Sequence, residues 1–91
     1  MFFLAESHNT GDPTPYLQAE GARVHELQQA GIVETVFLKA DRSGAILLLR
    51  AVDAAAARDA LGSLPLVANG ITSFGEFTEV IPAGEVHGTP A

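Results

Sequence analysis

The sequence predicts one α+β domain in which strands and helices follow the order strand–helix–strand, strand–helix–strand. Two stretches with apolar residues every three or four positions alternate with segments in which apolar and polar residues alternate. Glycine and proline stand at the junctions between these segments. The 91 residues fit a single domain, residues 1–81, followed by a C-terminal tail or arm rich in proline and glycine, residues 82–91.

The first strand and the first helix occupy the first third of the chain. Residues 2–7 (FFLAES) form a strand pattern, and the turn-forming cluster HNTGDPTP follows it. Thr14 and Pro15 are typical of a helix N-cap and of the first helical position. The helix should end at Gly31, because glycine readily adopts the left-handed conformation found after a helix C-terminus.

A hairpin of two strands occupies the middle of the chain. Residues 32–39 alternate and are rich in β-branched and aromatic side chains. The connection ADRSG, residues 40–44, is a turn in which Gly44 is expected to adopt a positive φ. Residues 45–52 (AILLLRAV) are apolar on both faces of the strand except at Arg50, and such a strand is normally covered on both faces.

The second helix and the last strand complete the domain. Asp53 is a good N-cap for the helix AAAARDALG. Pro65 cannot continue that helix and favours extended geometry at Leu64. Leu64 and Leu66 should anchor the junction in the core, so that the last strand, residues 71–81, enters the sheet in register.

This order of elements predicts the ferredoxin-like βαββαβ fold. Right-handed crossovers place both helices on one face of a four-stranded antiparallel sheet. Because residues 45–52 are apolar on both faces, we expect a second sheet on the other face, so that two copies form a dimeric α+β barrel. A hydrophobic content of 47% without any cysteine also favours a homodimer or higher oligomer, since surplus apolar surface needs cover.

Composition and charge disfavour several classes of function. A net charge of −6 disfavours nucleic acid and anionic membranes as partners, and no apolar run is long enough to span a bilayer. The third strand also lacks the aromatic residues on which bases stack. Without cysteine, and with three scattered histidines, no metal site is predicted. We expect a cytoplasmic protein whose partners are a small molecule and a second copy of itself.

Two segments, residues 26–38 (ELQQAGIVETVFL) and residues 45–66 (AILLLRAVDAAAARDALGSLPL), resemble the muconolactone isomerase-like family of dimeric α+β barrels. That family similarly has a helix ending in Leu-Gln before a glycine, and a second helix closing on Leu-Pro-Leu before the last strand. The similarity covers residues 20–79. The same segments also resemble the YCII-related proteins of that superfamily. No catalytic residue is carried over by position, because the aromatic segments of the isomerases are replaced here.

The resemblance implies a cofactor-independent isomerase, lyase or cyclase acting on a small carbonyl or lactone compound. A base removes a proton α to a carbonyl and an acid returns one elsewhere. The alternative is a non-catalytic small-ligand-binding or assembly module, and a flavin-free monooxygenase is a third, less favoured possibility. The catalytic and the non-catalytic hypotheses differ in whether ionisable side chains converge in a pocket, as acid/base catalysis requires. If Arg50, Glu76, His8 and His25 were all exposed, the catalytic hypothesis would lose its basis.

Four ionisable residues are candidates for catalysis. Glu6 and His8 lie two apart at the end of the first strand, so their side chains share a face and can form an acid/base pair; the alternative is a solvated strand end. His25, in the first helix, is a candidate base or a half-exposed helical histidine. Glu76, expected on the same face as Phe74, is a candidate base or an exposed glutamate.

Two further residues are candidates for substrate binding. Arg50 interrupts an apolar strand, so its guanidinium either binds a substrate carboxylate or pairs with Glu34 or Glu76 across the sheet. Tyr16 either donates a hydrogen bond to a carbonyl or closes the core with its polar end. His87, in the tail, is expected to be solvated.

Overall fold

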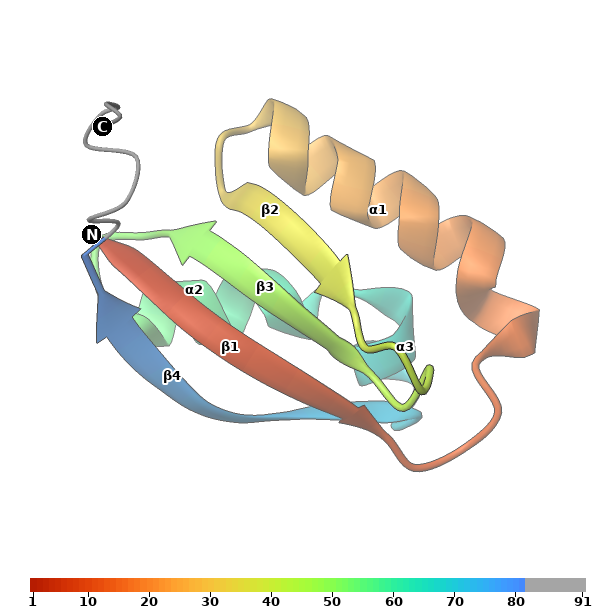
Figure 1. Ribbon diagram of the computed structural model, residues 1–91. Helices are drawn as coiled ribbons and strands as arrows, with labels where there is room; N and C mark the ends of the chain where they lie inside the picture. The colour runs from red at the N-terminus through yellow and green to blue at the C-terminus, as the bar shows by residue number, and fades with distance from the viewer. Residues whose placement is uncertain (82–91) are drawn as a thin grey trace.

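The computed structural model describes residues 1–81, in which a four-stranded antiparallel sheet carries helices on one face (Figure 1). The predicted ferredoxin-like βαββαβ order is confirmed, with one additional short helix before the last strand. The predicted tail and His87 lie outside the described residues. The elements are β1 (Phe2–Asn9), the 3-10 helix η1 (Thr14–Tyr16), α1 (Leu17–Gln29), β2 (Val33–Leu38), β3 (Ala45–Arg50), α2 (Ala54–Gly62), α3 (Pro65–Ala68) and β4 (Thr72–Val80).

The strands lie in the order β2-β3-β1-β4, so that β1 and β3 are central. The register is fixed by Leu4 of β1, which lies opposite Leu48 of β3 on one side and opposite Thr78 of β4 on the other. In Figure 1, α2 and α3 lie behind the sheet and α1 runs along β2. The opposite face of the sheet, here called the open face, carries no helix from residues 1–81.

The core lies between the sheet and the helices. Alternate residues of β1 and β3 point into it, because successive side chains of a strand face opposite sides. Leu49 of β3 and Leu61 of α2 are almost completely buried, and each such leucine contributes about 1.5–3 kcal/mol by leaving water. The buried cluster is Phe3, Ala5, Leu27, Val33, Leu47, Leu49, Ala57, Leu61 and Leu64.

The junction between α2 and β4 has the local structure that the sequence predicts. The carboxylate Oδ1 of Asp53 accepts the backbone N–H of Ala56 at 2.8 Å, which caps α2. Leu64 is extended, with ψ 134°, as the following proline favours. Pro65 is then the first residue of the short helix α3. Leu64 and Leu66 are both buried, so their predicted anchoring role is confirmed.

Two local predictions are wrong. Thr14 does not cap the first helix: its N–H bonds the Asp12 carboxylate and it begins η1, so α1 starts only at Leu17. In the β2–β3 turn the positive φ belongs to Arg42, at 65°, and not to Gly44. Gly44 is required for a different reason, because a Cβ there would lie only 2.0 Å from the backbone oxygen of Ser7.

A bulge in β4 changes which side chains face the core. Ala5 pairs with Phe77 and Ser7 pairs with Phe74, so β4 has one more residue than β1 over this interval. Phe74 and Phe77 therefore both pack against the core, with ring centroids 6.0 Å apart. The sequence predicts that Phe74 shares a face with Glu76. The extra residue interrupts the alternation of the strand and packs Phe74 against the core, although its side chain still reaches the hollow that Glu76 lines.

Candidate functional site

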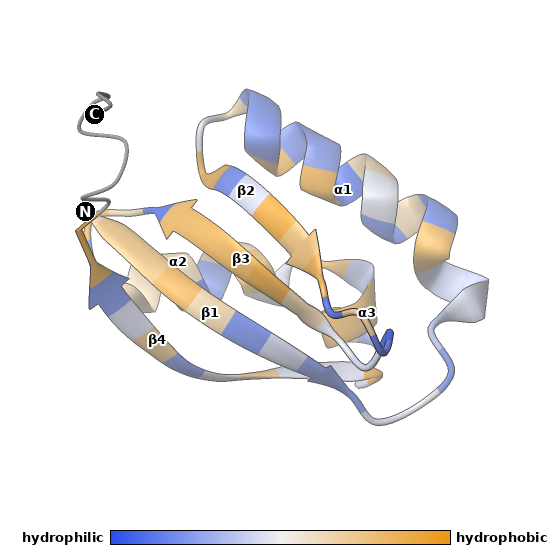
Figure 2. Ribbon diagram, in the orientation of Figure 1, coloured by the Kyte–Doolittle hydropathy of each residue, from blue (hydrophilic) through white to orange (hydrophobic). Residues whose placement is uncertain are grey.

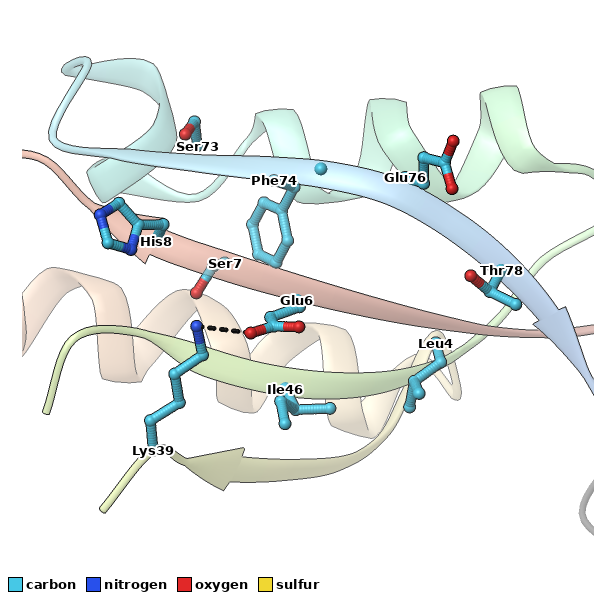
Figure 3. Close-up of a pocket in the computed structure, with 11 residues that line it drawn as sticks. Leu4, Glu6, Ser7, His8, Lys39, Ile46, Ser73, Phe74, Glu76 and Thr78 are labelled. Atoms are coloured by element: carbon cyan, nitrogen blue, oxygen red, sulfur yellow. Dashed lines mark ion pairs between the residues drawn. The ribbon is translucent and has the colours of Figure 1, made fainter. Parts of the chain in front are cut away.

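The open face carries a hollow of about 610 Å³ over β1 and β4 (Figure 3). Its floor includes the apolar side chains of Leu4 and Ile46, and its walls are largely polar. The lining residues are Leu4, Glu6, Ser7 and His8 of β1, Lys39 after β2, Ile46 of β3, and Ser73, Phe74, Gly75, Glu76 and Thr78 of β4.

An ion pair crosses one side of the hollow. Lys39 follows the edge strand β2, and its Nζ lies 2.7 Å from Oε2 of Glu6 on β1 (Figure 3). Because β3 lies between these two strands, the lysine side chain spans a neighbouring strand to make the contact. The Glu6 side chain is exposed and that of Lys39 is half-buried, and a pair at the surface stabilises a fold by about 1 kcal/mol or less, so its main effect here is to place an ammonium group in the hollow.

His8 and Glu76 supply the other ionisable groups of the hollow. His8 pairs with Ser73 across β1 and β4, whereas Glu76 lies in the bulged part of β4, next to Gly75. Among the described residues, no ion pair or side-chain hydrogen bond involves Glu76 or His8. Glu6 therefore pairs with Lys39 and not with His8, although the predicted shared face of Glu6 and His8 is present.

Three of the predicted site residues come together in the hollow, namely Glu6, His8 and Glu76. His25 lies exposed on α1, outside the hollow. Tyr16 is the last residue of η1 and does not line the hollow either.

Arg50 has two structural partners near the end of β3. Its Nη2 lies 3.0 Å from Oε2 of Glu34, one of the two partners proposed from the sequence. Its guanidinium also lies over the ring of Phe2, with 5.0 Å between Cζ and the ring centroid. Arg50 does not line the hollow, and Glu34 already provides the carboxylate that a substrate would otherwise supply.

In the single chain, Arg50, Glu76, His8 and His25 are all exposed. The exposure of all four side chains is the result expected to remove the basis for acid/base catalysis, and it does so for an isolated chain. Any catalytic use of the hollow therefore depends on a second molecule covering the open face.

The sequence did not single out Lys39, Ser73 or Thr78 as site residues. Lys39 enters the hollow only because β2 and β3 pair in a particular register and β3 lies next to β1. Ser73 and Thr78 lie on either side of the bulge in β4. The only signal for them in the sequence is that each is a polar residue in a segment predicted to be a strand.

An apolar patch adjoins the hollow on the open face. In Figure 2, β1 is hydrophobic over its first half and hydrophilic further along, and β3 is hydrophobic over most of its length. The side chain of Phe37 at the edge of the patch is 60% exposed. Cross-strand pairing places six apolar residues on this face: Phe2, Leu4, Phe37, Ile46, Leu48 and Val80.

Within residues 1–81, no three histidine, aspartate or glutamate side chains are grouped closely enough to hold a metal ion. None of the helices in this part of the chain has the length and hydrophobicity needed to cross a bilayer.

Compared with known proteins, the chain matches neither a protein-family model nor a curated protein.

Proposed function

We propose that the chain acts as a homodimer in which two open sheet faces enclose the hollow, and that the hollow isomerises a small carbonyl or lactone compound by acid/base catalysis. The observation that carries this proposal is that His8, Glu76 and the Glu6–Lys39 ion pair line one hollow beside an exposed apolar patch. The expected family, with its dimeric α+β barrels and lactone chemistry, agrees with this arrangement.

The apolar patch supports pairing through the open face. Each 100 Å² of apolar surface covered by a second copy favours association by about 2.5 kcal/mol before entropy losses. Ion pairs lie at two sides of the patch, Lys39–Glu6 near the hollow and Arg50–Glu34 at the far end of β3. Because each pair is internally neutralised, neither needs a counter-charge from the second copy.

The side chains in the hollow suit a proton-transfer reaction. The carboxylate of Glu76 makes no ion pair within the described residues, so it is free to remove a proton α to the substrate carbonyl. The electron pair of the broken C–H bond moves towards the carbonyl oxygen, where the Lys39 ammonium stabilises the developing negative charge. His8, as the general acid, then delivers a proton to a different carbon. Exchange with solvent removes the proton from Glu76 and returns one to His8, so that each turnover leaves the protein unchanged and only rearranges the substrate.

The charges of the hollow favour an uncharged substrate. Glu6 and Glu76 contribute two negative charges and Lys39 one positive charge. A substrate carboxylate would therefore approach two carboxylates, one of which must stay unpaired to act as the base, in a protein of net charge −6. A lactone, ketone or ester avoids this repulsion, so the closed lactone is preferred to its open hydroxy acid.

The second candidate is a non-catalytic ligand-binding or assembly module. The specific observation in its favour is the exposure of His8 and Glu76 in the single chain. Under this alternative, the same face pairs with a second copy and the hollow binds a ligand without transforming it.

The experiment combines sedimentation at micromolar concentration with an isomerisation assay. A β,γ-unsaturated lactone is the probe, and its conversion to the conjugated isomer is followed by ultraviolet absorbance. Glu76→Gln and His8→Gln should each lower the rate by about a hundredfold, which is the usual contribution of one acid or base. Glu79→Gln is the matched control, because Glu79 lies exposed on the same strand but outside the hollow.

Each result decides between the candidates. A monomer at micromolar concentration contradicts the proposal as a whole. A dimer that binds the lactone but does not convert it supports the non-catalytic alternative. A dimer whose turnover is unchanged in both hollow variants contradicts the roles given to His8 and Glu76.

A further inference from the structure

A second cavity, of about 220 Å³, lies at the end of the sheet where the helix layer meets the β2–β3 hairpin. The end of β1, the start of β4, the hairpin, α1 and α3 all contribute to its walls. Ser7 is the one residue that lines both this cavity and the hollow on the open face, and neither His8 nor Glu76 lines this cavity, so the inference is independent of the function proposed for the hollow.

The walls of this cavity are mainly apolar and include two exposed leucines. Leu17 of α1 is 54% exposed and Leu38 of β2 is 69% exposed. Leu66 of α3 adds a buried apolar surface. Concave sites with apolar walls and a few polar groups are typical of small-molecule binding, and a ligand here would cover both exposed leucines.

Two opposite charges also line the cavity. Glu20 of α1 is half-buried, and its Oε1 accepts the backbone N–H of Leu66 at 2.9 Å. Burial raises the pKa of Glu20 above its ordinary value. Arg42 of the hairpin is the second charged residue. Within residues 1–81, neither Glu20 nor Arg42 forms an ion pair, so the carboxylate and the guanidinium both lack a counter-charge.

We propose that this cavity binds a small apolar α-amino acid. The ammonium group of the ligand contacts the Glu20 carboxylate, and the ligand carboxylate binds the Arg42 guanidinium, which suits carboxylates geometrically. The apolar side chain of the ligand packs against Leu17 and Leu38. A molecule with both charges and an apolar body matches all three features of the cavity.

The volume agrees with a ligand of this size. With about 30 Å³ for each water molecule in the liquid, the cavity has room for about seven waters, which an amino acid of the size of leucine would displace. Larger aromatic amino acids should extend beyond Leu38 into solvent and bind less well.

The test is an NMR titration of the ¹⁵N-labelled full chain with L-leucine. Two matched probes each lack one charge: 4-methylpentanoate has no ammonium group, and isoamylamine has no carboxylate. L-Leucine should shift the amide signals of Leu38, Gly44 and Leu66 and should bind at least about tenfold more tightly than either probe, because each probe loses one charge-assisted contact. The amides of Leu4 and Thr78, on the open face and away from the cavity residues, should not shift.

Variants connect the binding to the two charges. Glu20→Gln and Arg42→Gln should each weaken leucine binding by about tenfold or more. Arg23→Gln is the control, since Arg23 lies on α1 but pairs with Glu26 and does not line the cavity. The comparison of the three probes uses the unaltered protein, so it stands even where a variant folds poorly.

Three results would overturn the proposal. The first is no shift at Leu38, Gly44 or Leu66 with up to about 10 mM leucine, a concentration that would detect even millimolar affinity. The second is equal binding of leucine and both probes. The third is energetic coupling between Glu20→Gln and Arg42→Gln in the ligand-free protein, because the two charges would then already neutralise each other.

Discussion

Replacing Gly44 with alanine should strongly destabilise the protein. An alanine Cβ would lie 2.0 Å from the backbone oxygen of Ser7 and 2.7 Å from its carbonyl carbon. These are backbone atoms of the central strand β1, so no flexible side chain can move aside to make room. The hairpin and β1 must therefore separate by more than an ångström at this point.

The separation would also break the hydrogen bonds that join the two segments. Ser7 Oγ accepts the N–H of Ala45 at 2.8 Å, and Ser43 O accepts the N–H of Asn9 at 2.7 Å. Overpacking costs about 1–3 kcal/mol and each lost bond about 1 kcal/mol, so the expected loss in the free energy of unfolding is about 3–5 kcal/mol. A domain of this size has about 5–14 kcal/mol in total.

Urea denaturation of Gly44→Ala and of a matched control measures this loss. The control is Gly62→Ala at the last residue of α2, where an added Cβ meets nothing within 4 Å and where alanine is the better helix former, by about 1 kcal/mol inside a helix and by less at its end. Gly62→Ala should be neutral or stabilising. If Gly44→Ala stays within about 0.5 kcal/mol of the unaltered protein, as surface changes usually do, the close approach of Gly44 to Ser7 does not constrain the fold.

Three further predictions concern charged residues. Burial raises the pKa of Glu20, so the folded state holds this proton more tightly than the unfolded state, and stability from this group is present below pH 4.5 and is lost as pH rises above it. In urea melts, the free energy of unfolding of Glu20→Gln relative to the unaltered protein should therefore increase between about pH 4 and pH 7, the range in which a carboxyl group with a raised pKa loses its proton. A difference that does not change with pH would contradict this prediction. Arg42→Gly should raise the free energy of unfolding by about 0.5–1 kcal/mol, because glycine adopts the φ of 65° without steric strain; a loss of stability would show that the arginine side chain holds the turn. Arg58→Ala should lower the melting temperature, because Arg58 donates to the backbone oxygen of Gly75 at 3.0 Å and lies over the ring of Phe77 at 4.4 Å, contacts worth about 1 kcal/mol together at an exposed site. Calorimetry that finds no change would mean that these contacts are too solvated to matter.

The features that the sequence predicts well depend on neighbouring residues. The start of α2 at Asp53 and its end before Pro65 are both predicted correctly. Both depend on residues within one helical turn, because Asp53 accepts a nearby backbone N–H and proline has no N–H to donate. The order of the elements then follows from the hydrophobic periodicity, and the topology follows from the handedness of the crossovers.

The features that the sequence does not predict depend on how distant segments pair. Nothing near Gly44 in the chain indicates that Ser7 approaches it, and a turn glycine is therefore attributed to its φ. The bulge in β4 likewise moves Phe74 to the core side without a change in composition. For the same reason Lys39 could not be placed in the hollow before the register of β2 and β3 was known.

The bulge in β4 separates two sets of constraints along one strand. Phe74 and Phe77 hold the strand to the core on either side of it, whereas Gly75 and Glu76 between them face outward, and an added Cβ at Gly75 would meet nothing within 4 Å. Substitutions at these two positions can therefore change the shape and charge of the hollow while the anchoring of the strand stays the same. If the hollow binds a ligand as proposed, changes in two adjacent codons can alter the ligand preference without first regaining lost stability.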